Sequence, residues 1–283
     1  MEKQDSKKKP NILPFVEGGL TGLLASSCTS LGISLVYNLG YYTLTSQQNA
    51  TITSYFRQFP AILFINTTTR TAQLGSFMTL KQRLEAANGG RPLNLYQEAC
   101  CGMAAGATEA FFGSPIYLAR RRIETNGTLI SVQQSYFRYL MLELCHTAMD
   151  KGVVALWRGG GYYAFPIIGY STGMLASYGR SVRYFEDSCG LSKSKSQLGG
   201  AVFSGFFASA CSLPCKNIAY AVLRDKKKYQ GKNFLYIALK SWELCGLQIF
   251  YKGFLKHFLR TSPSVVVTWV CFEDVRYAMN FIT

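Results

Sequence analysis

Long stretches without any charged residue dominate the hydrophobic pattern of this chain. Residues 18–56, 159–179 and 198–215 contain no Asp, Glu, Lys or Arg. About 18 to 20 residues of this kind suffice for a helix to cross the hydrocarbon core of a bilayer. The pattern therefore predicts membrane-spanning helices. The alternative is a soluble protein whose buried core helices show the same uncharged runs.

The apolar runs predict an all-α membrane protein with six transmembrane helices. The expected spans are 14–45, 58–84, 95–123, 159–185, 198–223 and 253–281. Residues 132–150 and 233–244 instead mix apolar and polar side chains, which is typical of amphipathic helices that lie in a membrane surface. Residues 46–56 are too short and uncharged for a full third helix of this kind, so a truncated one is expected there.

A phrase of small residues repeats three times along these helices. It occurs at residues 18–22, 102–106 and 201–205, and nine residues after each copy stands Leu31, Pro115 or Pro214, respectively. Glycines four apart let membrane helices approach closely, and a proline inside a helix kinks it. The repeat predicts three tandem two-helix units. After a polar tail at 1–10 they cover 11–93, 94–193 and 194–283, and the first is about 15 residues shorter than the others.

Charge changes this picture more than composition does. Apolar residues make up 48% of the chain and the mean hydropathy is +0.08, which is mild for a membrane protein. Mild hydropathy is expected when helices line a wet cavity. The net charge is +15. Lysines and arginines beside helix ends favour anionic lipid or an anionic solute, whereas no nucleic-acid-binding module is present.

Neither a metal site nor an enzyme active site is indicated. The nine cysteines form no CxxC pair, and four of them fall in apolar runs, where cysteine acts as a small hydrophobe. His146 and His257 are far apart and lack a ligand pattern. No nucleophile–base set or phosphate loop appears, so we expect no enzyme and no cofactor. The tail at 1–10 lacks the features of a signal or transit peptide.

Several motifs resemble the mitochondrial carrier family, most closely its 2-oxoglutarate/malate branch. They are the residues Gly102-Met103-Ala104-Ala105-Gly106, Thr67-Thr68-Thr69-Arg70 and Leu156-Trp157-Arg158-Gly159, together with the spacing from Pro115 to Arg122. The resemblance spans nearly the whole chain. It implies a multi-pass protein of the mitochondrial inner membrane with both termini in the intermembrane space. It also implies that the loops from odd to even helices face the matrix.

By this resemblance, a charged gate would stand at the matrix ends of the odd helices. Family members carry Pro-x-Asp/Glu-x-x-Lys/Arg there. The three copies in this chain read Leu31, Ile33, Val36; Pro115, Tyr117, Arg120; and Pro214, Lys216, Ala219. No acid remains, so Pro115, Arg120, Arg122 and Pro214 are a remnant of the motif. We expect a gate that closes by packing of Leu31, Ile33 and Tyr117 rather than by a ring of salt bridges.

The opposite face would use an aromatic-acid-x-x-base motif on each even helix. One complete copy remains, in which Glu273 and Arg276 are the charged pair that follows Phe272. The copy at Phe77 has lost its acid, and the copy at Tyr178 has lost both charges. One complete copy in three predicts a remnant of the cytoplasmic-side network and no closed ring.

The resemblance places substrate contacts at one position on each even helix. Arg260 stands at this position on the sixth helix, whereas the fourth helix has Pro166 there and the second has Ile62 or Ile65. Arg70 lies nearby, in the segment of the second helix that matches the family text, and is the second candidate. Guanidinium groups suit bidentate binding of carboxylates, and cations inside a membrane are usually functional. Pairing of these arginines with Glu109 or Glu17 inside the bundle is the alternative.

Short aromatic, basic and glycine motifs resemble the family's cardiolipin sites. Backbone amides at a helix N-terminus with a nearby basic side chain suit a phosphate, so bound cardiolipin is expected. The alternative is that these motifs are plain turns that anchor helices at the membrane interface. The residues are Trp157, Arg158 and Gly159; Tyr229 and Gly231; and Tyr251, Lys252 and Gly253.

Scaffold features of the carrier family persist in this chain while the gate charges are lost. This contrast predicts a carrier-fold protein that no longer transports by the usual mechanism. Such a protein would serve as a structural or accessory subunit among other inner-membrane subunits, for example in a respiratory complex. The alternative is a diverged solute carrier that exchanges 2-oxoglutarate, malate or another small anion by means of Arg70 and Arg260.

Overall fold

All regular secondary structure in the described part of the chain is helical. The computed structural model describes residues 13–29, 52–125, 136–158, 160–224 and 234–282. The elements are α1 (Leu13–Cys28), α3 (Ile52–Ala87), α4 (Leu95–Thr125), α5 (Tyr136–Lys151), the 3₁₀ helix η2 (Val153–Leu156), α6 (Gly161–Asp187), α7 (Lys193–Arg224), α9 (Phe234–Cys245), α10 (Gln248–Tyr251) and α11 (Phe254–Ile282). The all-α prediction is confirmed.

The predicted long helices correspond to α1, α3, α4, α6, α7 and α11. Helix α3 begins at Ile52, earlier than expected, so residues 52–56 belong to α3 and not to a truncated surface helix. The rest of that expected helix, the tail at 1–10 and the second half of the first predicted helix, including Leu31, lie outside the described residues. Helices α5 and α9 form where amphipathic helices were expected.

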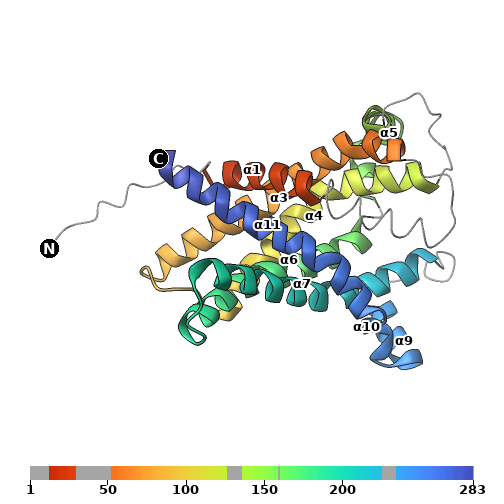
Figure 1. Cartoon of the computed structure of the whole chain (residues 1–283). Helices are drawn as coiled ribbons and strands as arrows, with labels where there is room; N and C mark the ends of the chain where they lie inside the picture. Colours follow the sequence, from red (N-terminus) through yellow and green to blue (C-terminus); the bar gives the residue numbers. More distant parts are fainter. Residues whose placement is uncertain (1–12, 30–51, 126–135, 159, 225–233, 283) are drawn as a thin grey trace.

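Within the described residues, these six long helices form a closed ring. Contacts join α1 to α3, α3 to α4, α4 to α6, α6 to α7, α7 to α11, and α11 back to α1. In Figure 1 the red helix α1 and the blue helix α11, from the two ends of the chain, lie side by side. A closed ring of helices encloses space along its axis, and this space is where a site can form.

The repeated small residues lie where neighbouring helices approach most closely. A Cβ atom on Gly106 of α4 would lie 2.8 Å from Ile168 Cα of α6. The equivalent glycines meet their partners in the same way, since Gly22 of α1 faces Thr67 of α3 and Gly205 of α7 faces Ser262 of α11. Small residues therefore permit the packing that the spacing predicted.

Two apolar clusters hold the short helices against the ring. Leu140 and Tyr136 of α5 pack on Ile65 of α3 and Ile123 of α4. On the other side, Ile237 of α9 packs with residues of α7 and α10. Figure 1 shows α5 and the pair α9 and α10 attached to the same end of the ring.

Among the described helices, the stretch Lys193–Val222 of α7 is the one that is long and apolar enough, by length and composition, to cross a membrane. Prolines lie inside α3, α4, α6, α7 and α11, and each helix continues past its proline. Greater bending at Pro115 and Pro214 than near Leu31 stays a prediction.

Candidate functional site

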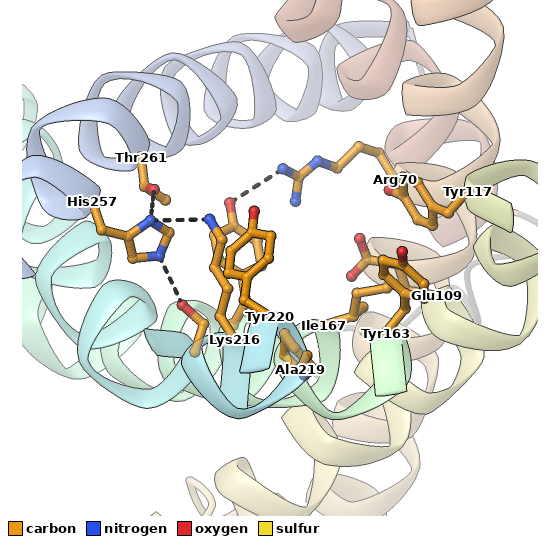
Figure 2. A pocket seen from close by; sticks show the side chains of 13 residues that line it. Arg70, Glu109, Tyr117, Tyr163, Ile167, Lys216, Ala219, Tyr220, His257 and Thr261 are labelled. Atoms are coloured by element: carbon orange, nitrogen blue, oxygen red, sulfur yellow. Dashed lines mark hydrogen bonds between the residues drawn. The ribbon is translucent and has the colours of Figure 1, made fainter. Parts of the chain in front are cut away.

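A cavity of about 410 Å³ opens inside the ring of helices. Its size suits a small molecule. The wall combines charged groups, hydroxyl groups and tyrosine rings from five helices: Arg70 of α3; Glu109 and Tyr117 of α4; Tyr163, Pro166, Ile167 and Tyr170 of α6; Ser212, Lys216, Ala219 and Tyr220 of α7; and His257 and Thr261 of α11. Figure 2 shows these side chains.

Arg70 reaches into the cavity from α3 and is held there by neutral groups. Its Nη1 donates to Gln73 Oε1 at 2.6 Å, and its Nη2 donates to the Tyr170 hydroxyl at 3.2 Å. The guanidinium also lies 5.4 Å from the centre of the Tyr170 ring, in cation–π range. These contacts orient the arginine without neutralising its charge.

The direct pairing of Arg70 with Glu109 or Glu17 that the sequence left open is not found. Within the described residues, Arg70 forms no ion pair, because its donors face Gln73 and Tyr170. Glu109 is buried and accepts a hydrogen bond from Ser171 Oγ at 2.7 Å. Ser171 in turn accepts one from Gln73 Nε2 at 2.8 Å. Arg70 and Glu109 are thus linked through two neutral side chains.

Lys216 enters the cavity from α7 and contacts a histidine of α11. Its Nζ lies 3.3 Å from His257 Nδ1, and the Thr261 hydroxyl lies 3.4 Å from the same nitrogen. Because an ammonium group can only donate, Nδ1 accepts, and Nε2 is left to donate to Ser212 Oγ at 3.2 Å. In the part of the chain that the structure covers, Lys216 has no carboxylate in ion-pair range.

The two predicted substrate arginines are not placed alike. Arg70 lines the cavity, whereas Arg260 is exposed and is not part of its wall. Its charge repels that of Lys216. The sequence places Lys216 at a gate position and gives His257 no role. Both are polar residues inside apolar helices, which is a signal for a functional site. The sequence does not show, however, that α7 and α11 bring the two side chains together.

The matrix-side remnant is dispersed in the structure. Tyr117, expected to pack in a gate, lines the cavity instead. Arg122 turns away and donates to Thr147 Oγ1 of α5 at 2.7 Å, and Arg120 is not among the lining residues. Pro115 and Pro214 lie within α4 and α7. The packed gate itself stays a prediction, because Leu31 and Ile33 are outside the described residues.

The cytoplasmic-side remnant lines a second, smaller cavity of about 210 Å³, whose wall includes Lys81, Glu273 and Arg276. Glu273 accepts a hydrogen bond from the Tyr178 hydroxyl at 3.1 Å. The Tyr178 ring stacks on Trp269 with 3.7 Å between the ring centres. Over the described ranges, Glu273 and Arg276 form no ion pair. The sequence predicted an incomplete ring of charges here, and the structure has a stack of two aromatic rings at this place.

The expected lipid motifs lie at the starts of α6 and α11. Trp157 Nε1 donates to Phe111 O at 2.9 Å, and its ring stacks on Phe111, while Arg158 is exposed. Before α11, Tyr251 and Lys252 are exposed and Gly253 adopts a φ of 78°. Gly159, Tyr229 and Gly231 lie outside the described residues. Exposed bases at two helix N-termini are compatible with phosphate binding.

A ring of long helices around a central cavity with cations in its wall is the arrangement expected of a membrane solute carrier. The sequence model of the family described as "Mitochondrial carrier protein" matches residues 91–188 and 192–281. The chain belongs to the mitochondrial carrier family, which confirms the resemblance.

Curated relatives match nearly the full chain. It is 33% identical over 288 residues to the mitochondrial dicarboxylate/tricarboxylate transporter DTC of Arabidopsis thaliana, with 96% of each chain covered. It is 27% identical to the human mitochondrial 2-oxoglutarate/malate carrier protein, covering 96% of this chain and 92% of the relative. A Caenorhabditis elegans protein of the same name is 24% identical, with 95% and 93% covered. These names favour the solute-carrier hypothesis over the accessory-subunit hypothesis.

Proposed function

We propose that this protein is a solute carrier that moves a small dicarboxylate across the mitochondrial inner membrane. The observation that carries the proposal is the placement of Arg70 and Lys216 in one cavity. Figure 2 shows the two side chains entering from different helices and pointing toward one another. Like charges in a confined, poorly solvated space repel, and an anion bound between them relieves that repulsion.

The chemistry of the wall supports a carboxylate ligand. The guanidinium of Arg70 offers paired donors and the ammonium of Lys216 offers a point charge. Tyrosine rings from three helices, at Tyr117, Tyr163, Tyr170 and Tyr220, narrow the space and add hydroxyl groups. The relatives named above are called dicarboxylate/tricarboxylate and 2-oxoglutarate/malate carriers, which suggests the same substrate class here.

Transport also requires that substrate binding favour one arrangement of the helices over another. A ligand shifts such an equilibrium only by the difference in its contacts with the two states. Arg70 belongs to α3 and Lys216 to α7. A dicarboxylate that bridges them ties together helices from different parts of the ring, and this contact supplies the required difference without an acidic gate.

The purified chain in liposomes tests this proposal. We expect saturable exchange of labelled 2-oxoglutarate for malate. Arg70→Gln and Lys216→Gln should each lower kcat/KM by about 10- to 100-fold, because a hydrogen bond to a charged group is worth about 1.5–3 kcal/mol. Arg260→Gln should have a smaller effect, since Arg260 is outside the wall. Arg138→Gln, an exposed change on α5, is the control.

The same experiment distinguishes the solute-carrier hypothesis from the accessory-subunit hypothesis. Absence of exchange for 2-oxoglutarate, malate, phosphate and nucleotides, together with a high-mass complex in mild detergent extracts, would support the accessory-subunit hypothesis. Exchange that Arg70→Gln and Lys216→Gln leave intact would remove the cavity from the mechanism. Placement of both termini in the intermembrane space is part of the proposal, and protease access to tags at each end checks it.

A further inference from the structure

Two opposite charges face the central cavity without pairing with each other. Arg70 and Glu109 both line its wall, and Glu109 is only 5% exposed. Within the described residues, no ion pair joins them. Charged groups that are buried in a protein are usually paired directly. Each of the two groups therefore keeps a charge that a ligand in the cavity can meet.

Hydrogen bonds inside the protein hold these two groups in place. Arg70 Nη1 donates to Gln73 Oε1 at 2.6 Å, and Gln73 Nε2 donates to Ser171 Oγ at 2.8 Å. Ser171 Oγ in turn donates to Glu109 Oε2 at 2.7 Å. Both Gln73 and Ser171 are fully buried. The guanidinium group and the carboxylate are thus fixed near each other, with two neutral side chains between them.

A cation and an anion that lie near each other without pairing match the head of an α-amino acid. The carboxylate and the ammonium group of such a molecule are attached to one carbon atom, so they need one positive and one negative partner close together. The guanidinium of Arg70 suits the carboxylate. Glu109 accepts one hydrogen bond from Ser171, whereas an ionised carboxylate can accept about four. Glu109 therefore has the capacity to accept hydrogen bonds from an ammonium group.

The surroundings of Glu109 suit an ammonium group better than a second anion. Tyr117 and Tyr163 line the cavity beside its carboxyl group (Figure 2). Aromatic rings attract an ammonium group that approaches their faces, and a fixed negative charge repels a carboxylate. A ligand that carries only carboxylates gains nothing from Glu109, whereas a ligand with an ammonium group gains a charged hydrogen bond.

The opposite end of the cavity is positive. Lys216 enters there from α7, and its Nζ lies 3.3 Å from His257 Nδ1. The charge of Arg260, on α11, acts on both Lys216 and His257. In the described part of the chain, no carboxylate lies within ion-pair range of Lys216. This end therefore suits a second carboxylate, and the two ends of the cavity differ in the groups that they favour.

We propose that the substrate of this carrier is an acidic amino acid, that is, a dicarboxylate that also carries an ammonium group. Arg70 binds the α-carboxylate, Glu109 binds the ammonium group, and Lys216 binds the second carboxylate. The inference rests on the proposed function and narrows its substrate class. Glu109 is then a specificity-determining residue, because it separates an amino dicarboxylate from a hydroxy or oxo dicarboxylate of the same size.

Matched pairs of substrates test this inference. Aspartate and malate differ by an ammonium and a hydroxyl group on one carbon atom, and glutamate differs from 2-oxoglutarate by an ammonium in place of an oxo group. The purified chain in liposomes is given each labelled solute, with the same solute inside. We expect kcat/KM for aspartate to exceed that for malate by about 10-fold or more, because a hydrogen bond to a charged group is strong.

The variant Glu109→Gln should reverse this preference. Glutamine keeps the size of the side chain and can still accept from Ser171, but it lacks the charge. The value of kcat/KM for aspartate should fall by about 10- to 100-fold, while that for malate should stay unchanged or rise. Asp274→Asn is the matched control, since Asp274 is an exposed carboxylate on α11 outside the cavity, and it should keep the preference for aspartate.

The outcomes separate this inference from the proposed function. Absence of exchange for all four solutes would overturn the proposed function and this inference with it. Exchange of malate and 2-oxoglutarate without exchange of aspartate or glutamate would overturn this inference alone, and that comparison needs no variant. Equal losses for aspartate and malate in Glu109→Gln would make Glu109 a structural residue and would also overturn the inference.

Discussion

Single glycines decide how closely the helices of this protein approach. A methyl group on Gly106 would lie 2.8 Å from Ile168 Cα, in the backbone of the neighbouring helix. Backbone cannot move aside as a flexible side chain can, so α4 and α6 would have to separate. The same spacing of small residues recurs at α1 and α7, which explains why one sequence phrase serves three interfaces.

Gly106→Ala should destabilise the protein, whereas Gly179→Ala should not. Overpacking at Gly106 costs about 1–3 kcal/mol. A Cβ on Gly179, within α6, would meet nothing within 4 Å, so alanine there should gain about 0.5–1 kcal/mol from helix propensity. Thermal unfolding of both variants in the same detergent measures the difference. Equal unfolding temperatures for the two would contradict the close approach of α4 and α6.

At the scale of elements, the starts of α6 and α11 carry exposed bases beside aromatic rings. Asn217 of α7 fixes the turn before α11, since its Nδ2 donates to Ile249 O at 3.1 Å and Phe250 O at 2.8 Å. On the other side, Trp157 is anchored on Phe111 of α4. Each helix start is therefore held in place by a neighbouring long helix.

Cardiolipin should be retained at these two helix starts. Arg158→Ala and Lys252→Ala should each reduce the number of cardiolipin molecules that remain bound in native mass spectrometry, because each removes about 1 kcal/mol of attraction to an anionic headgroup. Lys195→Ala, an exposed change at the first turn of α7, should leave retention unchanged. Equal retention in all three variants would argue for turns that only anchor the helices.

At the scale of the whole molecule, the ring closes where the first and last long helices meet. The thiols of Cys28, at the end of α1, and Cys271, on α11, lie side by side. Because α1 is the first long helix and α11 the last, this contact brings together residues from opposite ends of the chain.

Oxidation should therefore link Cys28 to Cys271. With hydrogen peroxide as the oxidant, the two thiols form a disulfide and the peroxide is reduced to water. Mass spectrometry of non-reduced peptides should detect the cross-link in the unmodified protein and not in Cys28→Ser. Treatment that cross-links Cys28 to another cysteine while Cys271 stays free would contradict the ring closure.

Local pattern determined the helical class, the number of long helices and the packing glycines of this protein. Uncharged runs of membrane-spanning length leave little choice but helices, and the spacing of Gly102 and Gly106 marks a packing face whatever the partner helix is. Family motifs such as Thr67-Thr68-Thr69-Arg70 were equally visible, and Arg70 does line the cavity.

Only the tertiary structure decided which charges share the cavity. Lys216 and His257 meet because α7 packs against α11, and Glu109 reaches Arg70 only through Gln73 and Ser171. Each of these contacts joins residues far apart in sequence, and a helix with polar residues on more than one side does not reveal which side faces the ring. Arg260 was expected in the site and is not part of the cavity wall, although His257 and Thr261 of the same helix are.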